Sequence, residues 1–504
     1  MNTFKKIIFT ATASWSNSAL LIVSNIATVP LILSKWSPEI FGIWLLIHAF
    51  RGTVGLPILA HQEYVFHENL KLGAKNIRKI SEHIFSAIPF GVALSLLIIG
   101  LLLINFNFSF FSNLFNIPNA FIKEWDLVIV FFAITALATS GVSGFFINAL
   151  AVLGYYPLVA WANFLRSLFS TLVPVGFIFL FNINFFEACL ILMLVDIIFF
   201  GFYYIVIFYI LKSNKFFFTK FNYTIGFNQF SSSFLVLIRF IFQNVTSDGI
   251  RFLIVLLFNP IALVMFSTIR TISNVVAKGL ESIYHSFVPE TMNALAEKNF
   301  KKFNSAFELY FLFSLIFIYP TVTIMHFVTP SFFTFWTLGK IEFDESLFLL
   351  FNFSLLATSL TMPFLALLVA NNLNKNVLSI MTVSLIFLAI TIAAGYKAIG
   401  ILSVALALFF YELAMLMLVI YYALSFFRSV KIIFFTKFLF FPPLMIIYSM
   451  VNISFVVNKK LFSNFFIYEA AIVILYLLLV LYSYTFLSAF TKNWLKKIFY
   501  KIKL

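Results

Sequence analysis

Residues 84–104 read IFSAIPFGVALSLLIIGLLLI, a stretch that contains no charged side chain. An apolar run of about 20 residues is long enough to cross the ~30 Å hydrocarbon core of a bilayer as an α-helix. Comparable runs follow one another along the whole sequence, in which 62% of the residues are hydrophobic and 10% are charged. The sequence therefore predicts an all-α polytopic membrane protein, and no soluble class fits this composition.

We expect about 14 transmembrane helices from these runs. The predicted spans lie near residues 11–33, 40–60, 84–104, 127–149, 158–181, 187–211, 232–258, 260–285, 305–328, 346–370, 377–396, 400–424, 437–457 and 465–490. With the N-terminus inside, 21 of the 33 basic residues fall in cytoplasmic segments, 6 in outer loops and 6 within spans. This asymmetry predicts cytoplasmic N- and C-termini. It also explains the net charge of +15 by topology and by contact with anionic membrane lipids, without a nucleic-acid partner.

The sequence lacks the common motifs of enzymes and of nucleotide or metal binding. It contains no Walker A sequence, no Gly-x-Gly-x-x-Gly, no His-Glu-x-x-His and no Gly-x-Ser-x-Gly. Its one cysteine, Cys189, excludes an intrachain disulfide and a cysteine-based metal cluster. We therefore expect no cofactor, no metal site and no catalytic residue, and we do not expect the chain to be an enzyme.

Two short patterns recur at nearly the same separation along the chain. Pro38 opens the second predicted span and Pro260 opens the eighth, 222 residues later. The loop sequence NIRKI at 76–80 is matched by NFKKF at 299–303, at an offset of 223 residues. These anchors indicate that spans 1–6 and 7–12 are two like bundles in parallel orientation. The predicted domains are a six-helix bundle at 1–211, an interfacial cytoplasmic linker at 212–231, a second six-helix bundle at 232–424, and two additional helices with a basic tail at 425–504.

Six basic side chains lie inside the predicted spans. They are Arg51, Arg166, Arg239, Arg251, Arg270 and Lys278. An Arg or Lys at the centre of a membrane helix costs about 2.5 to 3.5 kcal/mol even on lenient insertion scales, so such residues usually face a bundle interior or a water-filled cavity. Six of them therefore indicate a path for an anionic substrate.

Helix geometry places several of these cations at similar depth. At about 1.5 Å per residue, Arg51 and Arg270 lie roughly 16 Å from the outer surface and Arg251 roughly 12 Å, which is near the midplane. His48 shares a helix face with Arg51, and Lys278 lies deeper toward the cytoplasm than Arg270. We predict a cationic, substrate-binding cavity formed by Arg51, Arg270, Arg251, Arg239, His48 and Lys278.

Nearby acidic residues offer a structural explanation for some of the charges. Arg166 and Asp196 are predicted at similar depth on adjacent helices, where we favour a structural ion pair. Asp248 precedes Arg251 by three residues, so Arg251 either forms a structural pair or binds the substrate, and the sequence leaves both readings open. Glu412 in the twelfth span is either a site that couples transport to a proton or another ion, or a packed, protonated carboxyl.

The other cations fall into two groups. Lys278 has Glu281 three residues away and is close enough to the cytoplasm to snorkel, which favours a structural role. Arg239 is also within snorkelling reach, and both readings stay open for it. Arg51 and Arg270 have no acidic residue three or four positions away. We therefore expect them to be unpaired and to act on the substrate.

The first span is unusually polar for a membrane helix. Its hydroxyl and amide groups predict a hydrated face that contacts sugars, and helix packing through small polar residues is the alternative. The residues expected to face sugars are Ser14, Asn17, Ser18 and Asn25.

Two stretches resemble a known group of exporters. SPEIFGIW at 37–44 is similar to the Gly-Pro-Glu-x-x-Gly-x-Trp/Tyr pattern that opens the second span in the multidrug/oligosaccharidyl-lipid/polysaccharide (MOP) exporter superfamily. DGIRFLI at 248–254 resembles its Asp-Arg-hydrophobic stretch before the turn between spans 7 and 8. Within the superfamily, the chain resembles the Wzx-type flippases of O-antigen and related polysaccharides.

The resemblance implies two six-helix bundles in a V around a central cavity, lined mainly by spans 1, 2, 7 and 8, plus the two C-terminal helices. It implies a flippase that moves a polyprenyl-diphosphate-linked oligosaccharide across the bacterial cytoplasmic (inner) membrane by alternating access, as a step of lipopolysaccharide or related polysaccharide biosynthesis. The polysaccharide polymerase machinery is then an expected partner. Guanidinium groups suit a diphosphate because they match phosphate oxygens in bidentate geometry.

Two other functions stay open. A drug or organic-cation antiporter of the same superfamily would need acids in the first bundle's cavity, yet span 1 has none and span 2 offers only Arg51 and His48. A membrane polysaccharide polymerase or ligase, or a lipid-linked glycosyltransferase, would need a large outer loop or an acidic pair near the outer surface. No predicted outer loop exceeds about 25 residues, but Glu342, Asp344 and Glu345 share one of them.

Overall fold

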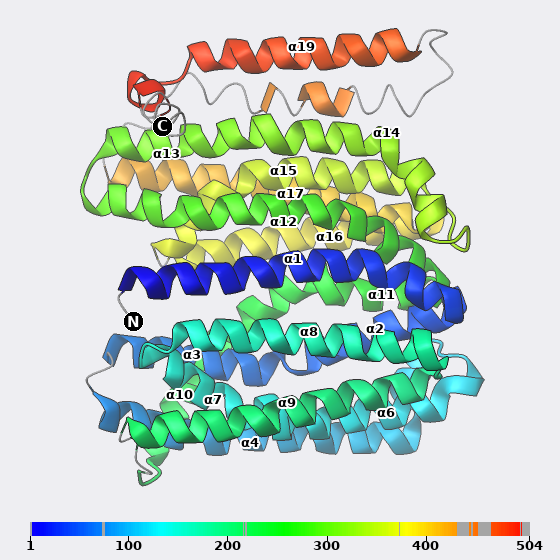
Figure 1. Ribbon diagram of the computed structural model, residues 1–504, viewed down its shortest axis with the longest axis vertical. Helices are drawn as coiled ribbons and strands as arrows, with labels where there is room; N and C mark the ends of the chain where they lie inside the picture. Colours follow the sequence, from blue (N-terminus) through cyan, green and yellow to red (C-terminus); the bar gives the residue numbers. More distant parts are fainter. Residues whose placement is uncertain are drawn as a thin grey trace. The chain divides into compact units, whose positions relative to one another are not determined.

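A computed structural model describes residues 3–72, 76–214, 216, 219–371, 373–430, 443–444, 447–451, 465–493 and 495. These residues fold into helices joined by short connections (Figure 1). By their contacts, the helices form two compact units, Met1–Ser267 and Thr268–Leu504. The predicted all-α, polytopic membrane fold is confirmed.

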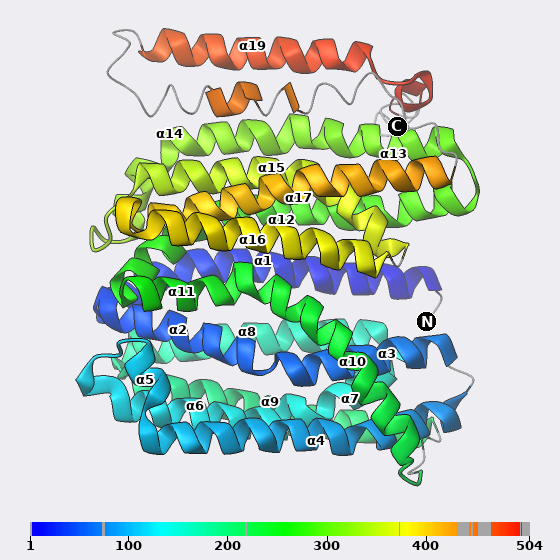
Figure 2. The same ribbon diagram turned by 180° about the vertical axis from the view of Figure 1, so that it is seen from behind.

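The first unit contains the helices from α1 to the start of α12. Their bounds are α1 (Thr3–Lys35), α2 (Pro38–Val54), α3 (Leu56–Leu72), α4 (Ile77–Phe108), α5 (Phe110–Leu114), η1 (Asn119–Phe121), α6 (Ile122–Ala136), η2 (Leu137–Gly141), α7 (Val142–Val152), α8 (Tyr156–Phe181), α9 (Phe185–Ser213), α10 (Tyr223–Asn244), η3 (Val245–Gly249), α11 (Ile250–Leu257) and α12 (Pro260–Ala296). Figure 2 shows α10 crossing obliquely over α3, against which it packs, whereas α4, α6 and α9 run nearly side by side.

The second unit contains the rest of α12 and the helices that follow it. They are α13 (Phe300–Phe313), η4 (Ser314–Ile318), α14 (Tyr319–Trp336), α15 (Glu345–Ala370), α16 (Asn374–Ile399), α17 (Leu402–Ser429) and α19 (Phe465–Thr485). α17 packs against both α15 and α16. Phe303 and Phe307 of α13 meet Phe427 of α17 edge to face, and all three side chains are buried. Aromatic packing of this kind contributes to the core of the unit, alongside many aliphatic side chains.

The predicted spans coincide with these helices. Among the described residues, ten helices are long and apolar enough to cross a membrane, and α2 with α3 makes an eleventh if the bent pair is one span. The fourth, seventh and ninth predicted spans each contain a short π-helical segment, namely η2, η3 and η4. α19 covers most of the last predicted span, whereas the span predicted at 437–457 lies largely outside the described residues.

The second span is longer and more polar than predicted. We expected it to end near residue 60, but after a bend of 42° the chain continues as α3 to Leu72. The first polar residues beyond position 60, His61 and Gln62, are compatible with a span because they are buried and hydrogen-bonded to other helices. His61 Nε2 lies 3.2 Å from the Ala87 carbonyl oxygen, and Gln62 donates to the Gly141 carbonyl at 3.0 Å.

The connection between the sixth and seventh spans is shorter than the linker predicted at 212–231. α9 continues to Ser213, and the Asn222 side chain caps α10 by accepting a hydrogen bond from the Ile225 amide at 3.3 Å. Residues from Tyr223 onward therefore belong to the helix of the seventh span. The assignment of the two bundles to 1–211 and 232–424 stays a prediction.

The repeated sequence patterns occupy corresponding places in the fold. Pro38 is the first residue of α2, and Pro260 is the first residue of α12. Proline suits this position because its fixed φ fits the first helical turn and its missing N–H would be unpaired there in any case. Asn76 directly precedes α4, and Asn299 caps α13 by accepting from the Lys302 amide at 3.1 Å. The two patterns thus mark equivalent helix starts.

Gly42 lies where α2 passes close to the start of α12. A Cβ atom at this position would lie 2.5 Å from the Pro260 carbonyl oxygen, a backbone atom that cannot swing away. We predict that Gly42→Ala destabilises the protein by about 1 to 3 kcal/mol, the usual cost of overpacking, and lowers its thermal midpoint in detergent. Gly100→Ala is the matched control, since no described atom lies within 4 Å of a Cβ at that position. Equal midpoints for the two variants would contradict this packing.

Candidate anion-binding cavity

Arg51 projects from a firmly packed helix. The Ser37 side chain caps α2 by accepting a hydrogen bond from the Ile40 amide at 3.3 Å. Ile47 and Phe50, which precede Arg51 on the same helix, are buried in the first unit. Arg51 itself lies in the last turn of α2, just before the bend into α3. Its depth in the unit is therefore set by the packing of α2.

Arg51 forms an ion pair with Asp196 of α9. The same carboxylate is 3.3 Å from Arg166 Nε of α8, and its side chain is only 5% exposed. The expectation that Arg51 is unpaired is therefore wrong, because its partner lies 145 residues away in sequence. The structure also contains the ion pair predicted between Arg166 and Asp196, with the difference that Asp196 is shared by two arginines.

A cavity of about 310 Å³ adjoins these three residues, and we call it the Arg51 cavity. Its walls come from α2, α3, α6, η2, α8 and α9 and consist of His48, Arg51, Gly52, Gly55, Ile58, Leu59, Phe132, Thr135, Ala136, Thr139, Arg166 and Asp196. Two guanidinium groups and one carboxylate leave this lining with a net positive charge. Such a lining favours an anionic ligand.

Aromatic rings hold both guanidinium groups of the cavity. Arg51 Cζ lies 5.4 Å from the centroid of the Phe132 ring, and Arg166 Cζ lies 4.7 Å from that of Phe200. Cation–π contacts contribute about 0.5 to 1 kcal/mol at exposed sites and more when desolvated. They also restrict the orientation of the guanidinium planes, which bidentate recognition of phosphate or carboxylate requires.

A second carboxylate lies against α2 beside Arg51. Asp248 Oδ1 is 3.2 Å from Arg251 Nη1, so the ion pair between these neighbours in sequence forms. A Cβ on Gly52 would lie 2.5 Å from Asp248 Oδ2, which shows how closely this carboxylate approaches α2. Arg51 and Arg251 both act electrostatically on His48. The structure thus brings Arg51, Arg251 and His48 into one charged region, with Asp248 at its edge.

Arg239 is paired with an acid that the sequence reasoning missed. Its Nη2 atom lies 2.5 Å from Glu63 Oε1, and His67 Nε2 lies 3.5 Å from the same oxygen. Glu63 was overlooked because the second span was expected to end near residue 60, whereas it lies within α3. One feature of the sequence could have pointed to it. Glu63 lies only three residues past the apolar run predicted at 40–60, and that run already contains a charged residue, Arg51. Arg239 is therefore half of an ion pair between α10 and α3.

In the second unit, Arg270 of α12 and Glu412 of α17 interact electrostatically. The expectation that Arg270 has no acidic partner is therefore wrong as well. The two units show the same arrangement. In the first, Arg51 of predicted span 2 lies near Asp196 of span 6, and in the second, Arg270 of span 8 lies near Glu412 of span 12. The proposed coupling role of Glu412 stays a prediction.

Lys278 also has an acidic partner. Its Nζ atom lies 2.6 Å from Glu281 Oε2, and the two side chains are 41% and 40% exposed. This is the pair that the i, i+3 spacing indicated, and its exposure fits a snorkelling lysine. Convergence of Lys278 and Arg270 with Arg51 on one anion stays a prediction.

The polar residues of the first span are only partly accounted for. Asn17 and Ser18 are half-buried on α1 and Asn25 is exposed, while the side chain of Ser14 lies outside the described part of the chain. Asn17 Oδ1 is buried and has no hydrogen-bond partner among the described residues. α1 packs along α8, the helix that carries Arg166. Contact of these residues with sugars stays a prediction.

Several solved structures of transporters resemble this chain. A multidrug resistance MATE family transporter of the MOP superfamily, in an inward-facing conformation, matches with a TM-score of 0.60 at 14% identity, over 84% of this chain and 99% of that one. The lipid II flippase MurJ, in an inward closed conformation, matches with a TM-score of 0.58 at 14% identity, over 95% of this chain and 98% of that one. The Vibrio cholerae MATE transporter VcmN matches with a TM-score of 0.53 at 14% identity, over 85% and 98%.

Comparison at the level of sequence adds no relative. No family model matches the chain, and none of the curated proteins matches it. The structural likeness shows the fold, which is that of the MATE transporters and of MurJ in the MOP superfamily. This is the fold that the patterns at 37–44 and 248–254 indicated.

Proposed function

We propose that the protein is a flippase that moves a polyprenyl-diphosphate-linked oligosaccharide, an O-antigen or related repeat unit, from the cytoplasmic to the outer leaflet of the bacterial inner membrane by alternating access. The observation that carries the proposal is the Arg51 cavity, where Arg51 and Arg166 share one buried carboxylate. An anionic head group does not cross lipid unaided. A cavity with net positive charge inside a membrane protein supplies the counter-charge that it needs.

Asp196 gives the empty cavity a stable resting state. Without substrate, its carboxylate pairs with both Arg51 and Arg166, so neither guanidinium group lacks an acidic partner. A diphosphate presents several oxygens, and two of them accept hydrogen bonds from the Arg51 guanidinium in place of Asp196. Arg166 keeps its ion pair with Asp196. Release of the head group on the other side restores the pair between Arg51 and Asp196. Binding and release are thus an exchange of partners rather than the exposure of a bare charge.

The likeness to MurJ supports a lipid-linked substrate. MurJ is a lipid II flippase, and its match extends over 95% of this chain, whereas the MATE transporters compared above match over 84% and 85% of it. A chain with more of its length in common with a lipid flippase is the better candidate for a lipid-linked cargo. The asymmetry of Lys and Arg in the loops supports cytoplasmic termini.

A drug or organic-cation antiporter is the second candidate, and one observation strengthens it. The first unit does contain acids near the second span, since Asp196 lines the Arg51 cavity and Asp248 lies against α2. An antiporter of organic cations needs acids of this kind, and the predicted spans 1 and 2 do not themselves supply them. The net positive charge of the lining still disfavours a cationic substrate. Energy-dependent extrusion of ethidium that Asp196→Asn abolishes would favour the antiporter.

Arg51→Lys tests whether the cavity recognises phosphate oxygens or only requires a positive charge. Lysine keeps the charge but loses the planar pair of donors, so we predict that surface polysaccharide falls severalfold without being abolished. Quantitative lectin labelling of intact cells measures this effect. Arg78→Lys, at an exposed position near the start of α4, is the matched control. Full display with Arg51→Lys would show that an electrostatic field is sufficient.

A further inference from the structure

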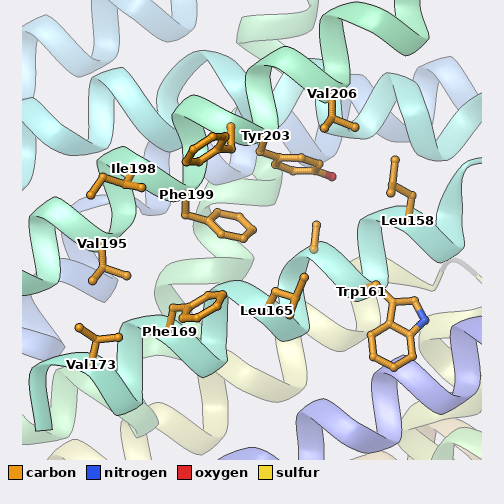
Figure 3. A pocket seen from close by; sticks show the side chains of 12 residues that line it. Leu158, Trp161, Leu165, Phe169, Val173, Val195, Ile198, Phe199, Tyr203 and Val206 are labelled. Carbon is orange, nitrogen blue, oxygen red and sulfur yellow. The ribbon is translucent and has the colours of Figure 1, made fainter. Parts of the chain in front are cut away.

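An apolar groove of about 540 Å³ lies between α8 and α9 in the first unit. Trp161, Leu165 and Phe169 follow at four-residue intervals on α8 and therefore share one face of that helix. Figure 3 shows this face opposite Phe199 and Tyr203 of α9, with the groove between them. Phe169 is 46% exposed, so the groove opens at the surface of the unit.

The groove and the Arg51 cavity use the same two helices at the same level. Leu165 and Val195 line the groove, while their chain neighbours Arg166 and Asp196 line the cavity. The ion pair between Arg166 Nε and Asp196 Oδ1, 3.3 Å long, joins α8 to α9 at this level. On both helices, a residue that lines the apolar groove is therefore followed directly by one that lines the Arg51 cavity.

The depth of Arg166, where the groove and the Arg51 cavity are adjacent, limits which ligands can bind in the groove. Arg166 lies ten residues after Tyr156, the first residue of α8. That is about 15 Å along the helix, or half of a hydrocarbon core of ~30 Å. Head groups of resting bilayer lipids stay in the interfacial layer and do not reach a cation at this depth. A lipid reaches it only when its anionic head has entered the cavity.

We propose that the groove holds the polyprenyl chain of the lipid-linked substrate while the diphosphate occupies the Arg51 cavity. This inference rests on the proposed function and adds a site for the apolar part of the substrate. Moving a chain from lipid into the groove gains packing contacts rather than hydrophobic energy. The groove therefore selects a methyl-branched chain by shape against its aromatic and aliphatic side chains, and it keeps the head group beside Arg166.

Filling the groove tests the proposal. Val195→Trp and Val206→Trp place an indole in it. Leu194→Trp and Ile205→Trp are the matched controls, because these neighbouring residues of α9 are exposed and lie outside the groove lining. Native mass spectrometry of the full-length protein measures the binding of polyprenyl diphosphate, inorganic diphosphate and phosphatidylglycerol to each variant.

The groove variants are expected to bind polyprenyl diphosphate about tenfold more weakly than the wild type, and the controls to bind it normally. Retained binding of inorganic diphosphate shows that the variants are folded and that the cavity is intact. Wild-type affinity for polyprenyl diphosphate in both groove variants would overturn the assignment. An equal loss of phosphatidylglycerol would also overturn it, because the groove would then accept any lipid chain. A wild-type protein that binds neither diphosphate would contradict the proposed function itself.

Discussion

Arg51→Ala is expected to abolish surface polysaccharide while the protein accumulates in the membrane at close to the wild-type level. Transport is lost because the variant lacks the guanidinium that takes over the diphosphate. The fold survives because Asp196 keeps Arg166 as a partner at 3.3 Å, so the substitution leaves no buried carboxylate alone. Lectin labelling of intact cells measures display, and quantitative immunoblotting of membranes measures the amount of protein.

The same experiment extends to the second unit and has an internal control. Arg270→Ala is expected to give the same loss, since Arg270 is predicted at the depth of Arg51. Arg78→Ala removes a positive charge at an exposed position and should leave display unchanged. Normal display in both Arg51→Ala and Arg270→Ala, at matched protein levels, would contradict the role of the cations.

Asp196→Ala is expected to cause a large loss of protein from the membrane, whereas Arg51→Ala should leave the amount of protein close to the wild-type level. Asp196 is the shared partner of Arg51 and Arg166, and its side chain is 5% exposed. Removing it leaves two guanidinium groups without a counter-charge, at a cost of roughly 3 to 5 kcal/mol. Immunoblotting and the thermal midpoint of the purified protein measure the loss. Glu39→Ala, which removes an exposed carboxylate at the start of α2, is the control.

Exchange of charges distinguishes a shared carboxylate from a simple pair. If Asp196 served Arg166 alone, the double variant Arg166→Asp, Asp196→Arg would recover the wild-type amount of protein. Because Arg51 contacts the same carboxylate, the exchange places a guanidinium against Arg51, and recovery should be incomplete. Adding Arg51→Ala removes that repulsion and should raise the amount of protein. Normal accumulation of every single variant would show that the cluster does not stabilise the fold.

The helical fold was predictable because each membrane span must be long enough to cross the hydrocarbon core and must pair its backbone N–H and C=O groups within the same helix. Apolar runs such as 84–104 therefore coincide with helices. The continuation of the second span through α3 was not predictable from hydropathy. His61 and Gln62 have the composition of a loop, yet they are buried and held by carbonyl groups of α4 and η2. Such partners become visible only when the helices are packed.

The candidate site was predictable only in part, for a related reason. The pair between Asp248 and Arg251 follows from helix geometry, because residues three apart share a face. The contact of Arg51 with Asp196 joins residues 145 positions apart and depends on how α2, α8 and α9 pack. Arg166 was predicted as the partner of Asp196 because the two residues were expected at similar depth on adjacent helices. That comparison of depths did not show that Arg51 also contacts Asp196. The cations within the spans could therefore be located from the sequence, whereas counter-charges far away in sequence, such as Asp196 for Arg51, could not.

The central claim is that this protein changes the leaflet of a lipid-linked oligosaccharide and leaves its covalent bonds intact. The most direct measurement is the accessibility of lipid-linked repeat units to a membrane-impermeant glycosidase in intact spheroplasts that lack the protein. We predict that complete repeat units accumulate and are protected, because they stay on the cytoplasmic side. Repeat units that accumulate in a form accessible to the glycosidase would contradict the account, since translocation would then have occurred without this protein, as expected for a missing polymerase or ligase.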